Sequence, residues 1–285
     1  MTSVLITGTS KGIGYDAALQ LARAGYDVIA TMRNPDGSDL GASAEAGSLP
    51  VTIRQLDVDD DLSVAEVFSE FGDIDILVNN AGILSCEAIE DESLEKFRAV
   101  METNFFGAVK CCKAVVPAMR KRGSGCIINI TSVAGLAAFA PDAAYSASKF
   151  ALEAFTEILA QEVNAFGVRV ALVEPGIITT PMTTTALPAY RSDTIYPQGR
   201  RIHAFFKNAA KEEAPPNLVS NKIQYIIESG TKRLRHPVGP DSLIFLGWRA
   251  ASTDEHLIDV FGSADDSDFI EKIDRDLGVD LSEFL

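Results

Sequence analysis

The sequence lacks any long hydrophobic run, although 47% of its 285 residues are hydrophobic. No stretch approaches the roughly 20 consecutive apolar residues that a membrane-spanning helix needs, so no segment is expected to cross a bilayer. The first residues also lack a basic start followed by an apolar core and a cleavage site, the pattern of a signal peptide. These absences favour a cytoplasmic protein.

Positive charge is also scarce. The chain has 25 Lys and Arg residues against 40 Asp and Glu residues, which gives a formal net charge of −15. Proteins that bind nucleic acid neutralise its phosphates with a basic surface, so we expect no nucleic-acid partner.

Cysteine and histidine are few, with 4 and 3 residues respectively. Their spacing matches neither a disulfide framework nor a set of metal ligands, so we expect reduced thiols and no metal site. The sequence contains no internal repeat and no linker long enough to separate two domains. It therefore predicts a single domain over residues 1–285.

A glycine cluster follows the first apolar segment. Residues 3–7 predict a buried strand, Gly8, Gly12 and Gly14 come directly after it, and residues 15–24 have helical periodicity. In this context Gly8 permits a tight turn, Gly12 leaves room for a pyrophosphate, and Gly14 lets the helix lie close to the sheet. The start of the helix presents free N–H groups to phosphate. This stretch therefore predicts a dinucleotide-binding site.

The end of the second predicted strand, residues 27–32, indicates which dinucleotide is bound. NAD-binding units usually carry Asp or Glu here to hold the ribose 2′-hydroxyl, whereas this chain has Met32 followed by Arg33. Lys11 adds a second cation within the glycine turn. Two cations and no carboxylate suit a 2′-phosphate, so we expect NADP(H) rather than NAD(H). The alternative is that Arg33 is only a solvated loop residue.

Apolar segments alternate with helical patterns along the rest of the chain, which is typical of a parallel α/β sheet. Further strands are predicted at residues 51–55, 74–78, 126–130, 169–173 and 235–239. Helices are predicted at residues 62–71, 93–122 (in two segments), 144–166, 218–235 and from 241. Residues 34–49 are predicted to form a loop. Asp57, after the third strand, either faces an adenine or starts the turn into the next helix. Asn79 and Asn80 follow the fourth strand, and we expect their amides to tie neighbouring strands together.

Three side chains with complementary proton chemistry occur around the fifth strand. Ser132 offers a hydroxyl, Tyr145 a phenol, and Lys149 an ammonium group one helical turn beyond Tyr145. A free phenol has a pKa of about 10, and a nearby cation favours the phenolate, so that Tyr145 can both give and take a proton. These residues therefore predict an acid–base site that interconverts a carbonyl and an alcohol. The alternative is a surface Tyr and Lys on an ordinary helix.

Taken together, the glycine turn, the Asn79-Asn80-Ala81-Gly82 stretch, Ser132 and Tyr145-x-x-x-Lys149 resemble the short-chain dehydrogenase/reductase family over roughly residues 3–182. The resemblance implies one doubly wound Rossmann-like α/β domain, with about seven parallel strands and helices on both faces. It also implies metal-free hydride transfer with NAD(P)(H), and a water held by Asn104 that links Lys149 to solvent. The expected catalytic residues are Asn104, Ser132, Tyr145 and Lys149. The expected cofactor-binding residues are Gly8, Ser10, Lys11, Gly12, Ile13, Gly14, Arg33, Asp57, Val58, Asn79, Ala81, Gly82, Tyr145, Lys149, Pro175, Gly176, Ile178 and Thr180.

The substrate is expected to be apolar. Candidate pocket residues are Leu84, Cys86, Phe139, Ala140 and Ile177, together with the aromatic residues of a substrate lid over residues 183–216. The apolar residues of this lid are Leu187, Tyr190, Ile202, Phe205 and Phe206. The sequences around Tyr145 and Met32 resemble the 17β-hydroxysteroid and retinol dehydrogenase branch of the family. We therefore expect interconversion of an apolar ketone or aldehyde with its alcohol.

Two other functions stay open at this point. Arg191, Arg200 and Arg201 in the lid suit a polar ketone, such as a 3-oxoacyl thioester or a sugar. A catalytically silent NADPH-binding sensor is the alternative from another class. Family members often pair through their two long helices, here residues 105–121 and 144–166, so a homodimer or homotetramer is expected. The acidic C-terminal extension, residues 263–285, either packs on the lid or a partner subunit through Phe269, Ile270 and Ile273, or is a solvated end.

Overall fold

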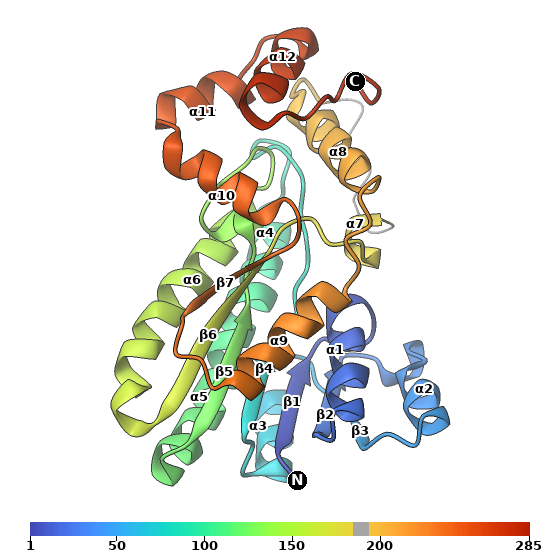
Figure 1. Cartoon of the computed structure of the whole chain (residues 1–285), viewed down its shortest axis with the longest axis vertical. Coiled ribbons are helices and arrows are strands. Elements are labelled where there is room, and N and C mark those ends of the chain that lie inside the picture. Colours follow the sequence, from blue (N-terminus) through green and yellow to red (C-terminus); the bar gives the residue numbers. More distant parts are fainter. Residues whose placement is uncertain (185–193) are drawn as a thin grey trace.

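The computed structural model describes residues 1–184 and 194–285, and it is built on a seven-stranded parallel sheet (Figure 1). The strand order is β3-β2-β1-β4-β5-β6-β7. The strands are β1 (Ser3–Thr7), β2 (Asp27–Met32), β3 (Val51–Gln55), β4 (Ile76–Asn79), β5 (Gly125–Ile130), β6 (Val168–Pro175) and β7 (Arg235–Val238). The order reverses between β1 and β4, and ligands of such sheets bind outside the carboxyl ends of the strands at this switch point.

Helices connect the strands and cover both faces of the sheet (Figure 1). The helices of the described residues are α1 (Gly12–Arg23), η1 (Pro35–Gly37), α2 (Leu40–Ala46), α3 (Asp61–Phe71), α4 (Leu94–Met101), the π-helix η2 (Glu102–Phe106), α5 (Gly107–Arg122), η3 (Val133–Gly135), α6 (Ala143–Val163), η4 (Asn164–Phe166), α7 (Pro181–Thr184), α8 (Gln198–Ala209), α9 (Asn217–Ser229), α10 (Ser242–Ala251), α11 (Asp254–Phe261) and α12 (Asp266–Leu277). Of these, α10 to α12 follow the last strand, and α11 and α12 lie beyond the sheet (Figure 1). None of the helices described here is both long and apolar enough to cross a membrane.

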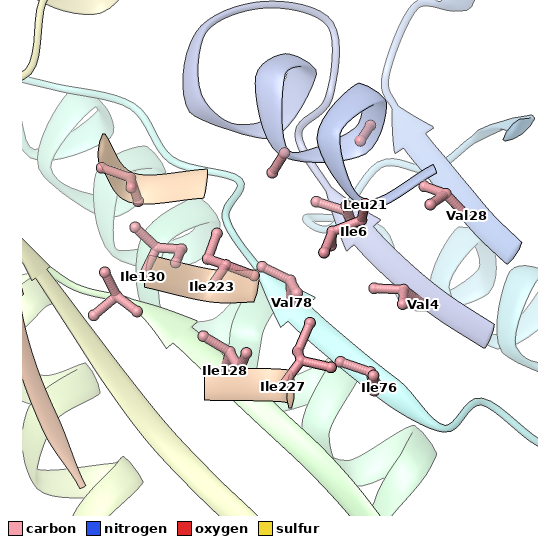
Figure 2. Close-up of a cluster of buried hydrophobic side chains, with 14 of the residues drawn as sticks. Val4, Ile6, Leu21, Val28, Ile76, Val78, Ile128, Ile130, Ile223 and Ile227 are labelled. Carbon is pink, nitrogen blue, oxygen red and sulfur yellow. The ribbon is translucent and has the colours of Figure 1, made fainter. Parts of the chain in front are cut away.

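The central strands β1 and β4 are mainly apolar because both faces of the sheet are buried. Val4, Leu5 and Ile6 of β1 are all fully buried, yet Val4 and Ile6 contribute to one core and Leu5 to the other. Successive side chains of a strand point to opposite faces, so one short segment serves both cores. Figure 2 shows the first core, where Ile6 lies with Leu21 of α1, and Ile223 of α9 faces the neighbouring strands. The predicted fold class is confirmed.

Three elements differ from the expectation. Residues 34–49 are not only a loop, because η1 and α2 lie within them, and Leu40 and Ala44 of α2 pack one helical turn apart into the first core. The predicted helix 218–235 ends at Ser229, since Gly230 adopts a left-handed conformation with φ +64° that closes the helix. The lid is more helical than expected, with α8 in its described part.

The C-terminal extension is a folded part of the molecule. In Figure 1, α12 lies beside α8. Phe269 and Ile273 of α12 are fully buried in a third core with Phe205 of α8, whereas Ile270 is only partly buried. Arg201 of α8 is 1% exposed, and its Nε donates to Asp266 at 2.9 Å while its guanidinium group lies 4.7 Å from the ring centroid of Phe269. Of the alternatives, packing on the lid is therefore the one observed.

Replacing Asp266 with asparagine is expected to destabilise this C-terminal unit, by about 3 kcal/mol, because it leaves the buried Arg201 cation without its carboxylate. Asp268→Asn is the matched control, since Asp268 pairs with Lys272 at a more exposed site, with 44% of the Asp268 side chain accessible. We expect it to cost less than about 1 kcal/mol. Urea unfolding of both variants checks the difference, and equal losses would contradict the assigned role of Asp266.

Candidate active site

The glycine turn lies at the carboxyl end of β1, as predicted. Gly8 and Gly12 adopt φ values of +71° and +67°, which residues with a Cβ rarely adopt. At Gly14 a Cβ would lie 2.5 Å from the carbonyl oxygen of Gly8 and 2.5 Å from the amide nitrogen of Asn80. Lys11, the N-cap of α1, makes no side-chain cap hydrogen bond. The first N–H groups of α1 are thus left without the usual side-chain partner.

Neighbouring strands are tied together at this edge by the two asparagines. Asn79 Nδ2 donates to Asn129 Oδ1 of β5 at 2.8 Å. Asn80 Nδ2 donates to the carbonyl oxygen of Thr7 of β1 at 2.9 Å. The backbone N–H groups of Asn80 and Ala81 both donate to Thr7 Oγ1, each at 3.0 Å. The prediction that these amides join strands is confirmed. The small residues at the two strand ends let the backbones come close, since a Cβ on Gly8 would lie 2.7 Å from Ala81 Cα.

A second turn faces the glycine cluster, formed by residues 175–180 after β6. A Cβ on Gly12 would lie 3.5 Å from Thr180 Cβ, so the two segments are in contact distance. Asp241 holds the turn, because its Oδ2 accepts a hydrogen bond from Ile177 N at 2.8 Å. At Gly176 a Cβ would lie 1.9 Å from Asp241 Oδ1, which leaves space only for glycine. The position of Asp241, 64 residues away in the sequence, carried no signal for this role.

Ser132 and Tyr145 meet in the wall of one cavity. Ser132 follows β5 and begins η3, with its Oγ accepting a hydrogen bond from Ala134 N at 3.1 Å. Tyr145 lies in the first turn of α6, and the Ser132 side chain is close enough to influence its phenol. Lys149, one turn further along α6, is buried behind Tyr145 with Nζ 5.6 Å from the centroid of the Tyr145 ring.

The electrostatic expectation for Tyr145 needs a correction. Burial raises the pKa of Tyr145 to about 12, the neighbouring Ser132 hydroxyl opposes this rise, and the Asp142 carboxyl adds to it. The pKa of Tyr145 therefore lies above its ordinary value of 10.0 and not below it as expected. The Lys149 Nζ donates to the carbonyl oxygen of Ile130 at 2.9 Å. Burial also lowers the pKa of Lys149 to about 8, while the Glu153 carboxylate opposes this shift. In this structure the phenol is therefore a protonated group.

Asn104 lies within the π-helix η2, where the helix between α4 and α5 widens. Its side chain is 1% exposed and holds a loop: Oδ1 accepts from Ile83 N at 2.8 Å, and Nδ2 donates to Ile83 O at 3.0 Å. Nδ2 also donates to Ser148 Oγ at 3.0 Å. A Cβ on Gly82 would lie 3.3 Å from Asn104 Oδ1 and 3.8 Å from Lys149 Nζ. Asn104, Gly82 and Lys149 therefore come together, and Ser148 is a member of this cluster that the sequence reasoning missed.

The remaining predicted cofactor residues surround the same edge. Lys11 and Arg33 are exposed, whereas Met32 is 2% exposed and faces the core. Asp57 Oδ1 accepts a hydrogen bond from Asp59 N at 3.1 Å. This contact agrees with the expectation that Asp57 starts the turn into the next helix. Val58 packs against the start of α5, where a Cβ on Gly107 would lie 2.8 Å from its side chain. The partly buried Ser10 accepts a hydrogen bond from Ser38, Ile13 packs against the first core, and the side chain of Ile178 is buried.

The cavity at Ser132 and Tyr145 opens to solvent. Three expected pocket residues line it, namely Leu84, Phe139 and Ile177, as do the described lid residues Ile202, Phe205 and Phe206. Cys86 and Ala140 are not among its lining residues, and the expected lid residues Leu187, Tyr190 and Arg191 lie outside the described residues. Sequence reasoning missed Met182 of α7, Phe245 of α10 and Phe261 of α11. In the sequence they were distinguished only by an apolar side chain, and Phe245 and Phe261 lie more than 60 residues beyond α7.

A buried carboxyl near this edge makes stability depend on pH. Glu174 of β6 is 1% exposed, and burial raises its pKa from the ordinary value of 4.5 to about 7. The folded chain therefore keeps a proton that the unfolded chain releases, so stability falls as pH rises from about 4.5 to about 7. In Glu174→Gln this titration is absent. Its stability relative to the unmodified chain should rise over that window, on the order of 1–3 kcal/mol.

Urea unfolding at about pH 5 and about pH 8 measures this difference. Glu157→Gln is the matched control, because Glu157 pairs with the same Arg235 but has 48% of its side chain exposed. Its stability relative to the unmodified chain should change little with pH. A flat profile for Glu174→Gln would show that Glu174 does not hold its proton in the folded chain.

Comparison with known proteins gives the same picture as the geometry. The family model for short chain dehydrogenases matches residues 2–191. The oxidoreductase YusZ of Bacillus subtilis is 37% identical over 86% of this chain and 92% of its own length. Human retinol dehydrogenase 8 is 45% identical over 62% of this chain and 59% of its own length. A short-chain dehydrogenase structure from Streptomyces avermitilis covers 90% of this chain and 96% of its own, with a TM-score of 0.77 and 32% identity. This chain is an oxidoreductase that belongs to the short-chain dehydrogenase/reductase family, whose members bind a nicotinamide dinucleotide.

Proposed function

We propose that this protein is an NADP(H)-dependent oxidoreductase that interconverts an apolar ketone or aldehyde with its alcohol. The observation that carries the proposal is the meeting of the Ser132 and Tyr145 hydroxyls in the wall of an otherwise mainly apolar cavity, with Lys149 directly behind. Two hydroxyl groups at one point of an apolar surface suit a single carbonyl or alcohol oxygen.

The residues at the carboxyl edge fit a dinucleotide. The start of α1 has no side-chain cap, so its free N–H groups and the positive end of the helix dipole suit a pyrophosphate. Gly8, Gly12 and Gly14 keep the backbone close, and the facing 175–180 turn suits the nicotinamide half. Lys11 and Arg33 are exposed beside this edge and suit a 2′-phosphate. When bound, the nicotinamide supplies or accepts the hydride.

Tyr145 is the proposed acid and base. In the direction of reduction its phenol donates a proton to the carbonyl oxygen as negative charge develops there, and Ser132 donates a hydrogen bond to the same oxygen. Lys149 then stabilises the phenolate that remains. Positioned proton transfer of this kind contributes about 10²–10⁴-fold to a rate. Asn104 keeps Gly82 and Ile83 next to Lys149, and its holding of a water stays a prediction.

The cavity favours an apolar substrate over a polar one. Of the three lid arginines that suited a polar ketone, Arg191 lies outside the described residues, and Arg200 and Arg201 both donate to Asp266 instead of lining the cavity. Named relatives include a retinol dehydrogenase, which is consistent with an apolar alcohol. Pairing through α5 and α6 stays a prediction, as does a cytoplasmic location.

The test is a spectrophotometric assay of NADPH oxidation against a panel of apolar and polar ketones and aldehydes, with the reverse reaction on the alcohols. We expect turnover of apolar carbonyls, with higher kcat/KM than for sugars or acyl thioesters. The reverse ranking would favour the polar-ketone alternative. No turnover of any carbonyl, with NADPH binding intact, would favour the sensor.

The coenzyme preference is expected to depend on Arg33. Replacing Arg33 with aspartate removes one of the two exposed cations and adds a charge that repels a 2′-phosphate. We expect the affinity for NADPH to fall by about 10- to 100-fold while the affinity for NADH is kept or improved. Fluorescence titration with both coenzymes measures this. An unchanged ratio of the two dissociation constants would mean that Arg33 is only a solvated loop residue.

A further inference from the structure

The cavity that contains Tyr145 has a carboxyl group in its wall. Among the described residues that line the cavity, Asp142 is the single Asp or Glu. The residue is only 6% exposed, and one of its oxygens, Oδ1, is buried without a hydrogen-bond partner. A buried polar atom without a partner costs free energy, so a group of this kind needs an explanation.

The usual structural explanation does not apply to Asp142. It occupies the N-cap position of α6, where an aspartate normally accepts a hydrogen bond from the first turn of the helix. Here the side chain makes no cap hydrogen bond. Its carboxyl group is contacted instead by the Cys86 thiol, which satisfies only part of its capacity to accept hydrogen bonds.

Asp142 lies close to the reacting groups. It precedes Tyr145 by three residues at the start of α6, so the two side chains are on the same side of the first turn. The carboxyl also raises the pKa of the Tyr145 phenol, which requires proximity. A substrate whose carbonyl oxygen contacts Tyr145 and Ser132 would therefore bring its neighbouring carbons toward Asp142.

We propose that Asp142 is a substrate-binding residue that accepts a hydrogen bond from a hydroxyl group one or two carbons away from the reacting carbonyl. The preferred substrates would then be apolar hydroxyketones, and diols in the direction of oxidation. This inference rests on the proposed function, because it adds a second polar anchor to the same site. It also explains why an apolar cavity keeps a buried carboxyl group whose oxygen is unused within the protein.

The experiment compares matched pairs of ketones that differ in one hydroxyl group. In the first pair, benzoin carries the hydroxyl group on the carbon next to the carbonyl, and deoxybenzoin lacks it. In the second pair, the aldol of acetone with benzaldehyde carries the hydroxyl group one carbon further away, and benzylacetone lacks it. For at least one pair we expect kcat/KM to be about 10- to 100-fold higher for the hydroxyketone, because a ketone without the hydroxyl group leaves the Asp142 carboxyl group unpaired. In Asp142→Ala the ratio should fall to within about threefold of unity, mainly through a higher KM for the hydroxyketone.

Cys86→Ala is the matched control, because it removes the neighbour of the carboxyl group and keeps the carboxyl group itself. Its preference for the hydroxyketone should remain. If Asp142→Ala does not fold, Asp142→Asn carries the same test: its neutral amide accepts a weaker hydrogen bond, so the preference should fall severalfold. A purely structural role would lower the turnover of both ketones equally.

The outcomes separate the two proposals. If the unmodified enzyme reduces the deoxyketones and the ratio is the same with and without the Asp142 carboxyl, the role of Asp142 is overturned and the proposed function stands. If the enzyme reduces neither member of either pair nor any other carbonyl, the proposed function fails, and the role of Asp142 fails with it.

Discussion

Tyr145→Phe is expected to lower kcat by about 10²–10⁴-fold, because the variant keeps the ring and loses the proton that the reaction needs. The dissociation constant of NADPH should stay within about threefold, since binding of the dinucleotide depends on the glycine turn and the cations. Steady-state kinetics and a fluorescence titration measure the two quantities. A lower kcat with an unchanged dissociation constant of NADPH shows that the variant is folded and has lost the proton transfer.

The control for this variant is Tyr225→Phe. Tyr225 lies on α9 with 52% of its surface exposed, and it does not line the cavity. Its replacement should leave kcat unchanged. If Tyr145→Phe kept most of its activity, the phenol would not be the acid, and another proton donor in the cavity wall, such as Asp142, would have to be sought.

Gly14→Ala is expected to affect both folding and cofactor binding. The added Cβ would lie 2.5 Å from the Gly8 carbonyl oxygen, which is backbone, and 2.5 Å from the Asn80 amide, which donates to Thr7 O at 2.9 Å. Neither atom can move without breaking the contact between α1 and the ends of β1 and β4. We expect a loss of about 1–3 kcal/mol in the free energy of unfolding. The affinity for NADPH should fall by about 10- to 100-fold as the start of α1 shifts.

Gly247→Ala in α10 is the matched control. A Cβ on Gly247 has nothing within 4 Å and the residue has ordinary helical geometry. Alanine favours a helix over glycine by about 1 kcal/mol, so this variant should be as stable as the unmodified chain or more stable. Urea unfolding and NADPH titration of both variants measure the contrast. A Gly14→Ala variant that matched Gly247→Ala would mean that α1 does not need its close approach to the sheet.

The parallel sheet was predictable because its strands carry a local signal. Val4, Leu5 and Ile6 belong to an apolar run between polar turns, and a run of that kind is buried on both sides wherever it pairs. Helix ends were less predictable. The sequence of α2 predicted a loop because Gly and Ser surround its alanines. The helix forms there because Leu40 and Ala44 are buried against the sheet.

By itself the sequence determined the glycine turn, the order of the strands along the chain, and the residue types for an acid–base site, because each depends on neighbours within a few turns of the backbone. Only the tertiary structure decided what surrounds that site. Asp241 at the 175–180 turn, Phe245 and Phe261 in the cavity wall, and the Arg201–Asp266 pair all join segments far apart in the chain. The pKa of Tyr145 was also decided there, because burial by the whole fold raises it above the ordinary value of a phenol.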